Sequence, residues 1–222
     1  MAGVSTFGTW SYIGSSEIIQ SLFGHSNPVT KSSDIILDFF DEEDTLDKYL
    51  NVEHLTKMSS APRFIHADLG IKTDSTGLAC SFIAGYKDIT SYDPVTGNEF
   101  LIRSPIVFNE WTLGIACKPG QEVPIYKIKN FLITAKQKGY PIAIVSTDGF
   151  QSTNLRQDLK LAGFETALIS VDRTMDPYNA LRDACLEGRC DLASDDIVAK
   201  EISELEQSSD GKKWDHSVGE LS

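Results

Sequence analysis

The hydrophobic pattern changes its period near Lys118-Pro119-Gly120, and this change separates two kinds of predicted structure. Before it, short apolar runs of the kind found in β-strands are bounded by polar, turn-forming residues. After it, apolar residues recur at helical spacing and alternate with compact, strand-like runs. Extended segments followed by alternating helix and strand predict an α/β layer built on a mixed sheet.

The individual segments can be placed along the chain. Strands are predicted over 63–69 (RFIHADL), 77–86 (GLACSFIAGY) and 100–116, with turns at 72–75 and 93–97. Beyond residue 120 a helix is predicted over 123–135, a strand over 141–147, a helix over 150–162, a strand over 165–171 and a helix over 177–186. Three antiparallel strands followed by alternating helices and strands is the order of the RNase H-like fold, which we therefore predict.

The N-terminal part has a different character. Residues 1–33 are rich in Ser, Gly and Thr and show little periodicity, which predicts a loosely structured arm. Within 34–53, Ile35, Ile36, Phe39 and Phe40 fall near helical spacing, and the acidic run that follows is interpreted as a solvated helix face. We expect an arm or linker with an acidic helix over 1–55 and one domain over 56–222.

Charge is distributed unevenly along the chain. The net charge is −12, but segment 34–53 carries −7 and segment 191–222 carries −6, whereas 54–190 carries +1. The central segment is therefore compatible with binding a polyanion. Lys127, Lys129, Lys136 and Lys138 lie on one predicted helix, where a solvated polar face and contact with a DNA backbone explain them equally well.

Several classes of protein are excluded by composition. The four cysteines and four histidines show no zinc-site spacing, so we expect reduced thiols and a metal held by oxygen atoms. The sequence contains no signal peptide and no apolar run of about 18 residues, which predicts a protein that is neither exported nor membrane-spanning. A phosphate-binding loop for ATP is also absent.

Two aspartates follow buried strand patterns. Asp68 ends a run in which Phe64 and His66 share its face, and Asp148 follows the compact run 142–147. Such carboxylates cost free energy unless a cation or hydrogen-bond donors compensate them. If the strands lie side by side, both acids reach one sheet edge, where open α/β sheets bind ligands. The alternatives are a turn-forming Asp68 and an Asp148 that caps the next helix.

Oxygen-only ligation by Asp68 and Asp148 favours Mg²⁺ or Mn²⁺. Two such ions roughly 4 Å apart activate a water and stabilise the leaving oxygen in phosphodiester hydrolysis. Gln151 and Ser152, at the predicted helix start, are candidates for supporting contacts to a phosphate. His66 is a candidate for orienting a water or phosphate, with a hydrogen-bonded core histidine as the alternative.

These residues resemble the nuclease domain of phage terminase large subunits. Segments 64–69 (FIHADL) and 73–77 (TDSTG) are similar to its first strand and hairpin, and 145–152 (VSTDGFQS) is similar to the region of its second acid. Further matches are Gln157, Leu159, Gly163, 170–172 (SVD), 186–189 (LEGR) and Trp214-Asp215-His216. Together they span residues 60–219 in the expected order.

The resemblance implies an RNase H-like endonuclease that cuts concatemeric double-stranded DNA during viral packaging, with two Mg²⁺ or Mn²⁺ ions on Asp68 and Asp148. It implies the terminase ATPase domain, the small terminase subunit and the portal as partners, and the host cytoplasm as the location. Asp215 is the candidate third metal ligand. The family places a further acid in a helix after the Asp-His motif, where this chain stops at Ser222, so we expect a domain truncated at its C-terminus.

Two other functions remain open at this point. A noncatalytic domain that docks to DNA or to the portal would keep the fold with an incomplete metal site. Another RNase H-like nuclease, such as a junction resolvase or a transposase-like enzyme, would share the strand-end acids.

Overall fold

A seven-stranded sheet is the central feature of the protein. The computed structural model describes residues 11–27, 29–30, 35–51, 53–54, 60–70, 75–149, 152–170, 174–208, 211 and 214–216. The strands follow the order β2-β5-β4-β3-β6-β7, and β8 pairs with β5 off this path. Their bounds are β2 Ile35–Leu37, β3 Arg63–Asp68, β4 Thr76–Tyr92, β5 Glu99–Cys117, β6 Ile142–Thr147, β7 Glu165–Leu168 and β8 Cys190–Asp191.

The sheet is mixed, as the sequence predicted. β3 and β4 pair antiparallel, as do β4 and β5, whereas β6 pairs parallel with β3 and β7 pairs parallel with β6. β3 therefore lies in the middle, and its Ile65 is opposite both Cys80 of β4 and Val145 of β6. Ile65 and Ala67 are buried, whereas Phe64 and Asp68 are exposed, so the predicted alternation of faces along β3 is confirmed.

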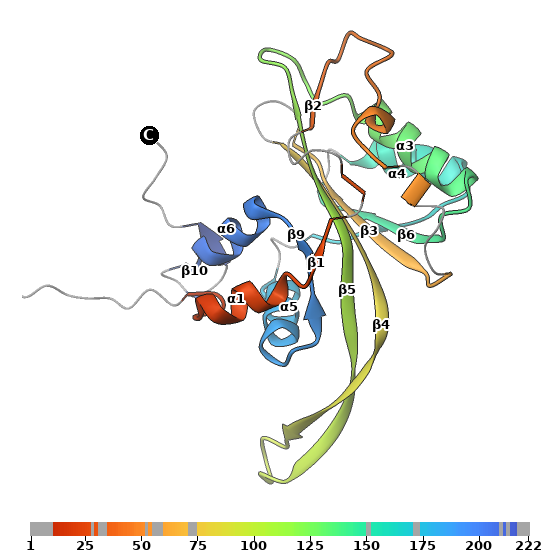
Figure 1. Ribbon diagram of the computed structural model, residues 1–222. Helices are drawn as coiled ribbons and strands as arrows, with labels where there is room; N and C mark the ends of the chain where they lie inside the picture. Colours follow the sequence, from red (N-terminus) through yellow and green to blue (C-terminus); the bar gives the residue numbers. More distant parts are fainter. Residues whose placement is uncertain are drawn as a thin grey trace, which may run out of the picture.

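Two helices, α3 (Ile125–Gln137) and α4 (Thr153–Leu161), cover one face of the sheet (Figure 1). Their apolar stripes are buried in the main core together with Trp111 of β5; the helix residues in this core are Ile128, Phe131, Leu132, Ala135, Leu155 and Leu159. The chain leaves α3 through Gly139, whose φ of 91° is the left-handed conformation that favours glycine after a helix. Both helices were predicted from their period.

The opposite face carries α1 (Ser16–Leu22), α5 (Asp176–Leu186) and α6 (Asp196–Glu204), seen beside β5 in Figure 1. They pack around a second apolar cluster that includes Tyr12, Cys185 and Trp214. Two short sheets complete this layer, one of β1 (His25–Ser26) with β9 (Ala193–Ser194) and one of β10 (Leu205–Gln207) with β11 (Trp214–His216). All four cysteines are free thiols, as predicted.

The N-terminal segment differs from the sequence prediction. Residues 11–27 are not a loose arm, because they form α1 and β1 and bury Tyr12 completely. The acidic helix expected within 34–53 is also wrong for the residues described there, since Ile35–Leu37 form β2 and Leu46–Lys48 form the 3₁₀ helix η1. The run of apolar residues is too short for its period to distinguish a helix from a strand. Parallel pairing of Ile35 with Ile115 of β5 favours the strand.

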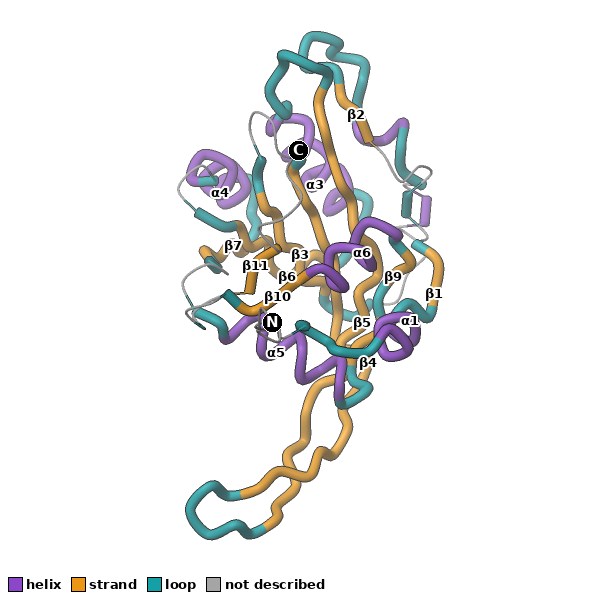
Figure 2. Tube along the Cα trace, turned by 90° about the vertical axis from the view of Figure 1, so that its left-hand side faces the viewer, coloured by secondary structure: helices purple, strands orange, loops and turns teal. Residues whose placement is uncertain are grey.

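β4 and β5 continue well beyond the rest of the sheet as a two-stranded arm (Figure 2). We call residues 85–106 the arm; among the described residues its strands pair only with each other, from Gly85 opposite Ile106 to Tyr92 opposite Glu99. Large apolar side chains are exposed along it, including Tyr86, Leu101 and Val95. Of the described helices, none combines the length and apolar character needed to cross a lipid bilayer.

A buried ion pair links the start of β3 to β5. The Arg63 guanidinium donates from Nη2 to Glu110 Oε1 (2.6 Å) and from Nε to Glu110 Oε2 (3.0 Å), and both side chains are 1% exposed. The Tyr140 hydroxyl donates to Glu110 and accepts a hydrogen bond from Trp111 Nε1 at 2.9 Å. Burial raises the pKa of Tyr140, so its hydroxyl keeps its proton and remains a donor.

Candidate active site

The two predicted carboxylates end adjacent strands at one edge of the sheet. β3 and β6 run parallel, with Ala67 opposite Thr147, so Asp68 and Asp148 follow at neighbouring positions. The backbone N–H of Asp148 points to the Ala67 carbonyl, 3.4 Å away. Asp68 is exposed and Asp148 is half-buried, which leaves both carboxylates within reach of solvent ions.

The turn after Asp148 is fixed by backbone conformation and by one hydroxyl. Gly149 has a φ of 55°, which a residue with a side chain rarely adopts. Ser152 is fully buried, and its Oγ lies 2.6 Å from the Asp148 carbonyl oxygen and accepts a hydrogen bond from Thr147 Oγ1 at 2.7 Å. α4 begins only at Thr153 with Ser152 as its N-cap, so Asp148 is not a helix cap.

His66 lies on the same face of β3 as Asp68. Its Nδ1 is 2.9 Å from Ser146 Oγ, and that hydroxyl donates to the Ile65 carbonyl at 3.3 Å. Nδ1–H must therefore donate to Ser146, which leaves Nε2 as the acceptor of the neutral ring. Burial lowers the pKa of His66, while the negative charges of Asp68 and Asp148 act in the opposite direction.

A cavity of about 410 Å³ opens over this strand face. Its walls come from β3, β4, β5 and α6, and they include His66, Asp68, Gly77, Gly114, Asp195 and Glu201. Gly77 and Gly114 leave room there, because a Cβ atom on either would meet nothing within 4 Å. The cavity thus places Asp68 opposite acids of α6 that are more than 120 residues away in sequence.

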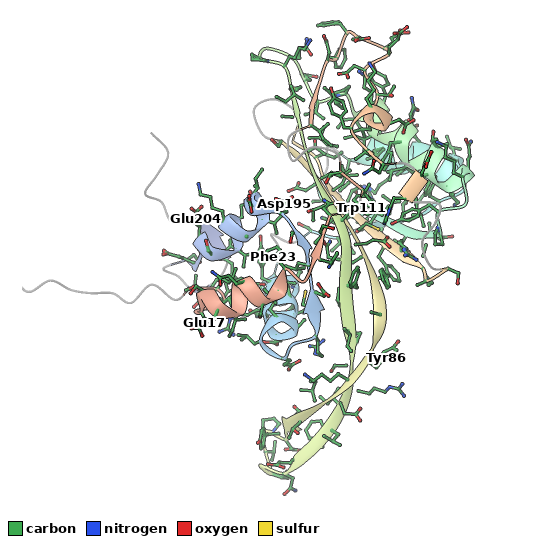
Figure 3. The ribbon with its side chains drawn as sticks, in the orientation of Figure 1. Glu17, Phe23, Tyr86, Trp111, Asp195 and Glu204 are labelled. Atoms are coloured by element: carbon green, nitrogen blue, oxygen red, sulfur yellow. The ribbon has the colours of Figure 1, made fainter. Side chains whose placement is uncertain are left out.

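Sequence reasoning missed Asp195 and Glu201. Asp195 is the N-cap of α6 and accepts from the N–H groups of Ile197 and Val198, while Thr112 Oγ1 donates to its other oxygen at 3.2 Å. Figure 3 shows Asp195 where α6 meets the sheet. The cap followed by Ile197 and Val198 is a detectable helix start, but the sequence analysis considered this region only for its net charge.

The donor set suits a hard divalent cation. Asp68 and Asp148 offer carboxylate oxygens, and Mg²⁺ commonly binds through one or two carboxylates completed by waters and substrate phosphates. Among the described residues, no three His, Cys, Asp or Glu side chains come close enough together to hold a metal on their own. The Asp215 side chain and all of Gln151 lie outside what the structure describes, so their predicted roles stay predictions.

No known family profile and no curated protein matches the sequence. Among solved structures, the large terminase nuclease from the thermophilic phage G20c matches with a TM-score of 0.53 and 12% identity over 94% of this chain and 89% of that one. The large terminase of bacteriophage HK97 matches with a TM-score of 0.51 and 11% identity over 93% of this chain. The chain spans 40% of the HK97 protein. The fold is therefore that of phage large terminase nucleases, which confirms the predicted RNase H-like class.

Proposed function

We propose that this chain, which has the fold of phage large terminase nucleases, is a metal-dependent endonuclease that cuts concatemeric double-stranded DNA during viral packaging. The observation that carries the proposal is the placement of Asp68 and Asp148 at the ends of the adjacent parallel strands β3 and β6. Two carboxylates at one sheet edge, reached by solvent, form the part of a two-metal hydrolytic site that the protein itself must supply.

Each residue of the site has a definite task in this proposal. Asp68 and Asp148 would hold the cations, and the chemistry that divalent cations would supply there is activation of a water and stabilisation of charge on the leaving oxygen. Gly149 and Ser152 hold the turn that carries Asp148. His66 presents Nε2 as an acceptor on the strand face beside Asp68, where it can orient a water.

The partners of the proposed enzyme follow from the same reasoning. Double-stranded DNA would meet the edge that carries Asp68 and Asp148, and cations are needed there because two carboxylates repel phosphates. The terminase ATPase domain, the small subunit and the portal are the further partners that we propose, with the host cytoplasm as the place of action. Asp215 remains our candidate for a third ligand.

Substitution of the two aspartates tests the proposal directly. We expect Asp68→Asn and Asp148→Asn each to reduce Mn²⁺-dependent nicking of plasmid DNA by at least about 100-fold, because an amide cannot replace a charged metal ligand. Glu99→Gln, which removes one exposed acid on the arm, is the matched control and should cut normally. Normal cutting by either aspartate variant, with an unchanged melting temperature, would exclude these residues as the site.

A noncatalytic docking domain is the second candidate function. It is favoured by the finding that the described side chains assemble no three-residue metal site. In that case the wild-type protein binds duplex DNA or the portal and shows no nicking at any Mn²⁺ concentration. Nicking that disappears in Asp68→Asn excludes this candidate.

A further inference from the structure

A short loop at the same end of the sheet as the proposed site exposes two aromatic side chains. We call residues 38–44, between β2 and η1, the Phe40 loop. Phe40 is 79% exposed and Phe39 is 37% exposed, and their rings lie 5.3 Å apart in an edge-to-face arrangement. Tyr126, at the start of α3, extends the aromatic surface.

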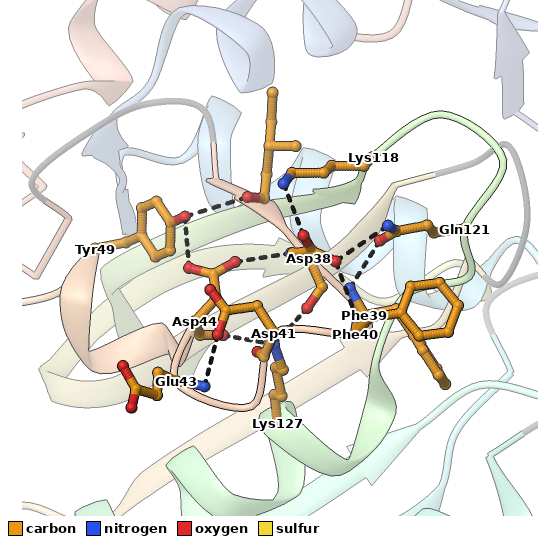
Figure 4. Close-up of polar contacts among 11 residues, drawn as sticks. Asp38, Phe39, Phe40, Asp41, Glu43, Asp44, Tyr49, Lys118, Gln121 and Lys127 are labelled. Carbon is orange, nitrogen blue, oxygen red and sulfur yellow. Dashed lines mark hydrogen bonds and ion pairs between the residues drawn. The ribbon is translucent and has the colours of Figure 1, made fainter.

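The Phe40 loop is held rigidly from beneath (Figure 4). The Lys127 ammonium is buried and donates to the carbonyl oxygens of Asp38, Asp41 and Asp44 at 2.5, 2.7 and 2.7 Å. The Asp38 carboxylate accepts from Lys118 at 2.7 Å and from Gln121 at 3.0 Å. The loop therefore presents its phenylalanines in a fixed position, and a preorganised aromatic surface loses little entropy when it binds a partner.

The charge around the aromatics narrows the choice of partner. Asp41, Glu42 and Glu43 are all exposed beside Phe40. A rim of three carboxylates disfavours contact with DNA and with anionic lipid surfaces. The surface that fits is an apolar protein patch rimmed by Lys or Arg.

At the other end of α3 this protein exposes one large apolar side chain together with lysines. Leu161, the last residue of α4, is 89% exposed, and we call Leu161 with Lys136, Lys138 and Lys160 the Leu161 patch. Lys136 Nζ donates to the Gly163 carbonyl at 2.5 Å, which holds the last turn of α3 against the end of α4. Asp158 and Glu165 are the acids nearest in sequence, and Asp158 already accepts a hydrogen bond from Lys129 at 2.8 Å, so the three lysines leave the patch an excess of positive charge.

The two surfaces cannot meet within one molecule. Tyr126 and Lys127 are in the first turn of α3 and Lys136 is in its last turn, so the helix separates the surfaces by about 15 Å. We propose that the Phe40 loop of one copy docks on the Leu161 patch of a second copy of this chain. Such a contact joins different surfaces head to tail, so each added copy leaves one free surface of each kind and association continues beyond a dimer.

Sedimentation velocity of the purified protein tests the proposal. We expect the weight-average sedimentation coefficient to rise with protein concentration past the value for a dimer, and to fall as salt screens the charges. Phe40→Ser and Leu161→Ser should each weaken association by at least about tenfold, as expected for a central aromatic or aliphatic anchor. Val95→Ser removes a residue that is 91% exposed on the arm and should change nothing.

Mixing the two variants gives the sharper result. Phe40→Ser keeps an intact Leu161 patch, and Leu161→Ser keeps an intact Phe40 loop. A head-to-tail contact therefore predicts that each variant alone is monomeric and that an equimolar mixture forms a dimer and nothing larger. A wild-type protein that stays monomeric, association unaffected by both substitutions, or a mixture that stays monomeric each overturns the proposal.

Discussion

The hydroxyl group of Tyr140 joins three buried side chains. It donates to Glu110, accepts from Trp111 Nε1 at 2.9 Å and lies 3.2 Å from Cys80 Sγ. Tyr140→Phe removes that hydroxyl and leaves the Trp111 N–H and one Glu110 oxygen without this partner. We expect the free energy of unfolding to fall by about 1–3 kcal/mol, measured by urea denaturation, because unsatisfied buried groups carry their full desolvation penalty.

A matched control separates the hydroxyl effect from a general effect of the substitution. Tyr86→Phe removes the same group from a half-exposed side chain on the arm and should change stability by no more than about 0.5 kcal/mol. Equal, small effects of both substitutions would mean that solvent reaches the cluster around Tyr140. In that case Arg63 and Glu110 would not be the buried pair that we describe.

The sequence indicated the role of a single residue only where the pattern of its neighbours along the chain was enough to do so. Asp68 and Asp148 were recognised because each directly ends its own apolar strand. Lys127 was grouped with three other lysines on a face expected to be solvated or in contact with a DNA backbone, yet it is buried and donates to carbonyl groups 83 to 89 residues away. Nothing in the sequence of α3 indicates that Lys127 contacts the Phe40 loop, so only the tertiary structure distinguishes this lysine from the others.

At the scale of elements, the stability that the Phe40 loop gains from the Asp38 carboxylate is expected to depend on pH. The hydrogen bond from Lys118 is the main cause that lowers the pKa of Asp38 from its ordinary value of 3.8 to about 2. A lowered folded-state pKa contributes stability above pH 3.8, and this contribution is lost as the pH falls toward 2. We therefore expect the melting temperature of the wild-type protein to exceed that of Asp38→Asn near neutral pH. This difference in melting temperature should shrink below about pH 4.

Thermal unfolding followed by circular dichroism at a series of pH values measures this difference. Glu42→Gln is the control, because it removes one acid from the same loop without touching the Lys118 contact. A gap between wild type and Asp38→Asn that stays constant down to acid unfolding would show that the charge of Asp38 does not stabilise the loop.

The arm is predicted to be the least protected part of the large hairpin. In the part of the chain that the structure describes, its strands pair only with each other, whereas residues 77–81 of β4 also pair with β3. An isolated two-stranded ribbon is marginally stable in water. Native-state hydrogen exchange should therefore show faster exchange for amides of residues 86–92 and 99–105 than for residues 77–81. Equal protection of the two regions would indicate that another surface covers the arm in solution.

Long elements with a clear period were predicted well, and short elements were not. β3, β6, α3 and α4 combine apolar pattern with turn or glycine signals at their ends, and the structure places them where expected. β2 has only three residues, and pairing with β5 decides its conformation. α6 was hidden by the acidity of its segment, although Asp195 caps it as a helix start should be capped. The cavity between α6 and β3 could not be predicted, since it depends on both.

For the whole molecule, the negative net charge predicts that the affinity for duplex DNA depends on divalent cations. The protein carries −12, and both proposed ligand carboxylates lie at the edge where DNA would approach. We therefore expect weak duplex binding in EDTA and at least about tenfold tighter binding with Ca²⁺ at constant ionic strength, because bound cations bridge carboxylates to phosphates. Fluorescence anisotropy with a labelled duplex measures both affinities.

The salt dependence and one variant distinguish this bridging from ordinary phosphate contacts. If cations at the site mediate binding, the slope of log K against log salt should be shallower than about −3, since few phosphates are neutralised by Lys or Arg. The double substitution Asp68→Asn with Asp148→Asn should remove the stimulation by Ca²⁺ while leaving the weak binding in EDTA unchanged or slightly tighter. Tight binding in EDTA with a steep slope would instead locate the DNA contact on a basic surface, of which the Leu161 patch is the first to test by Lys138→Glu and Lys160→Glu.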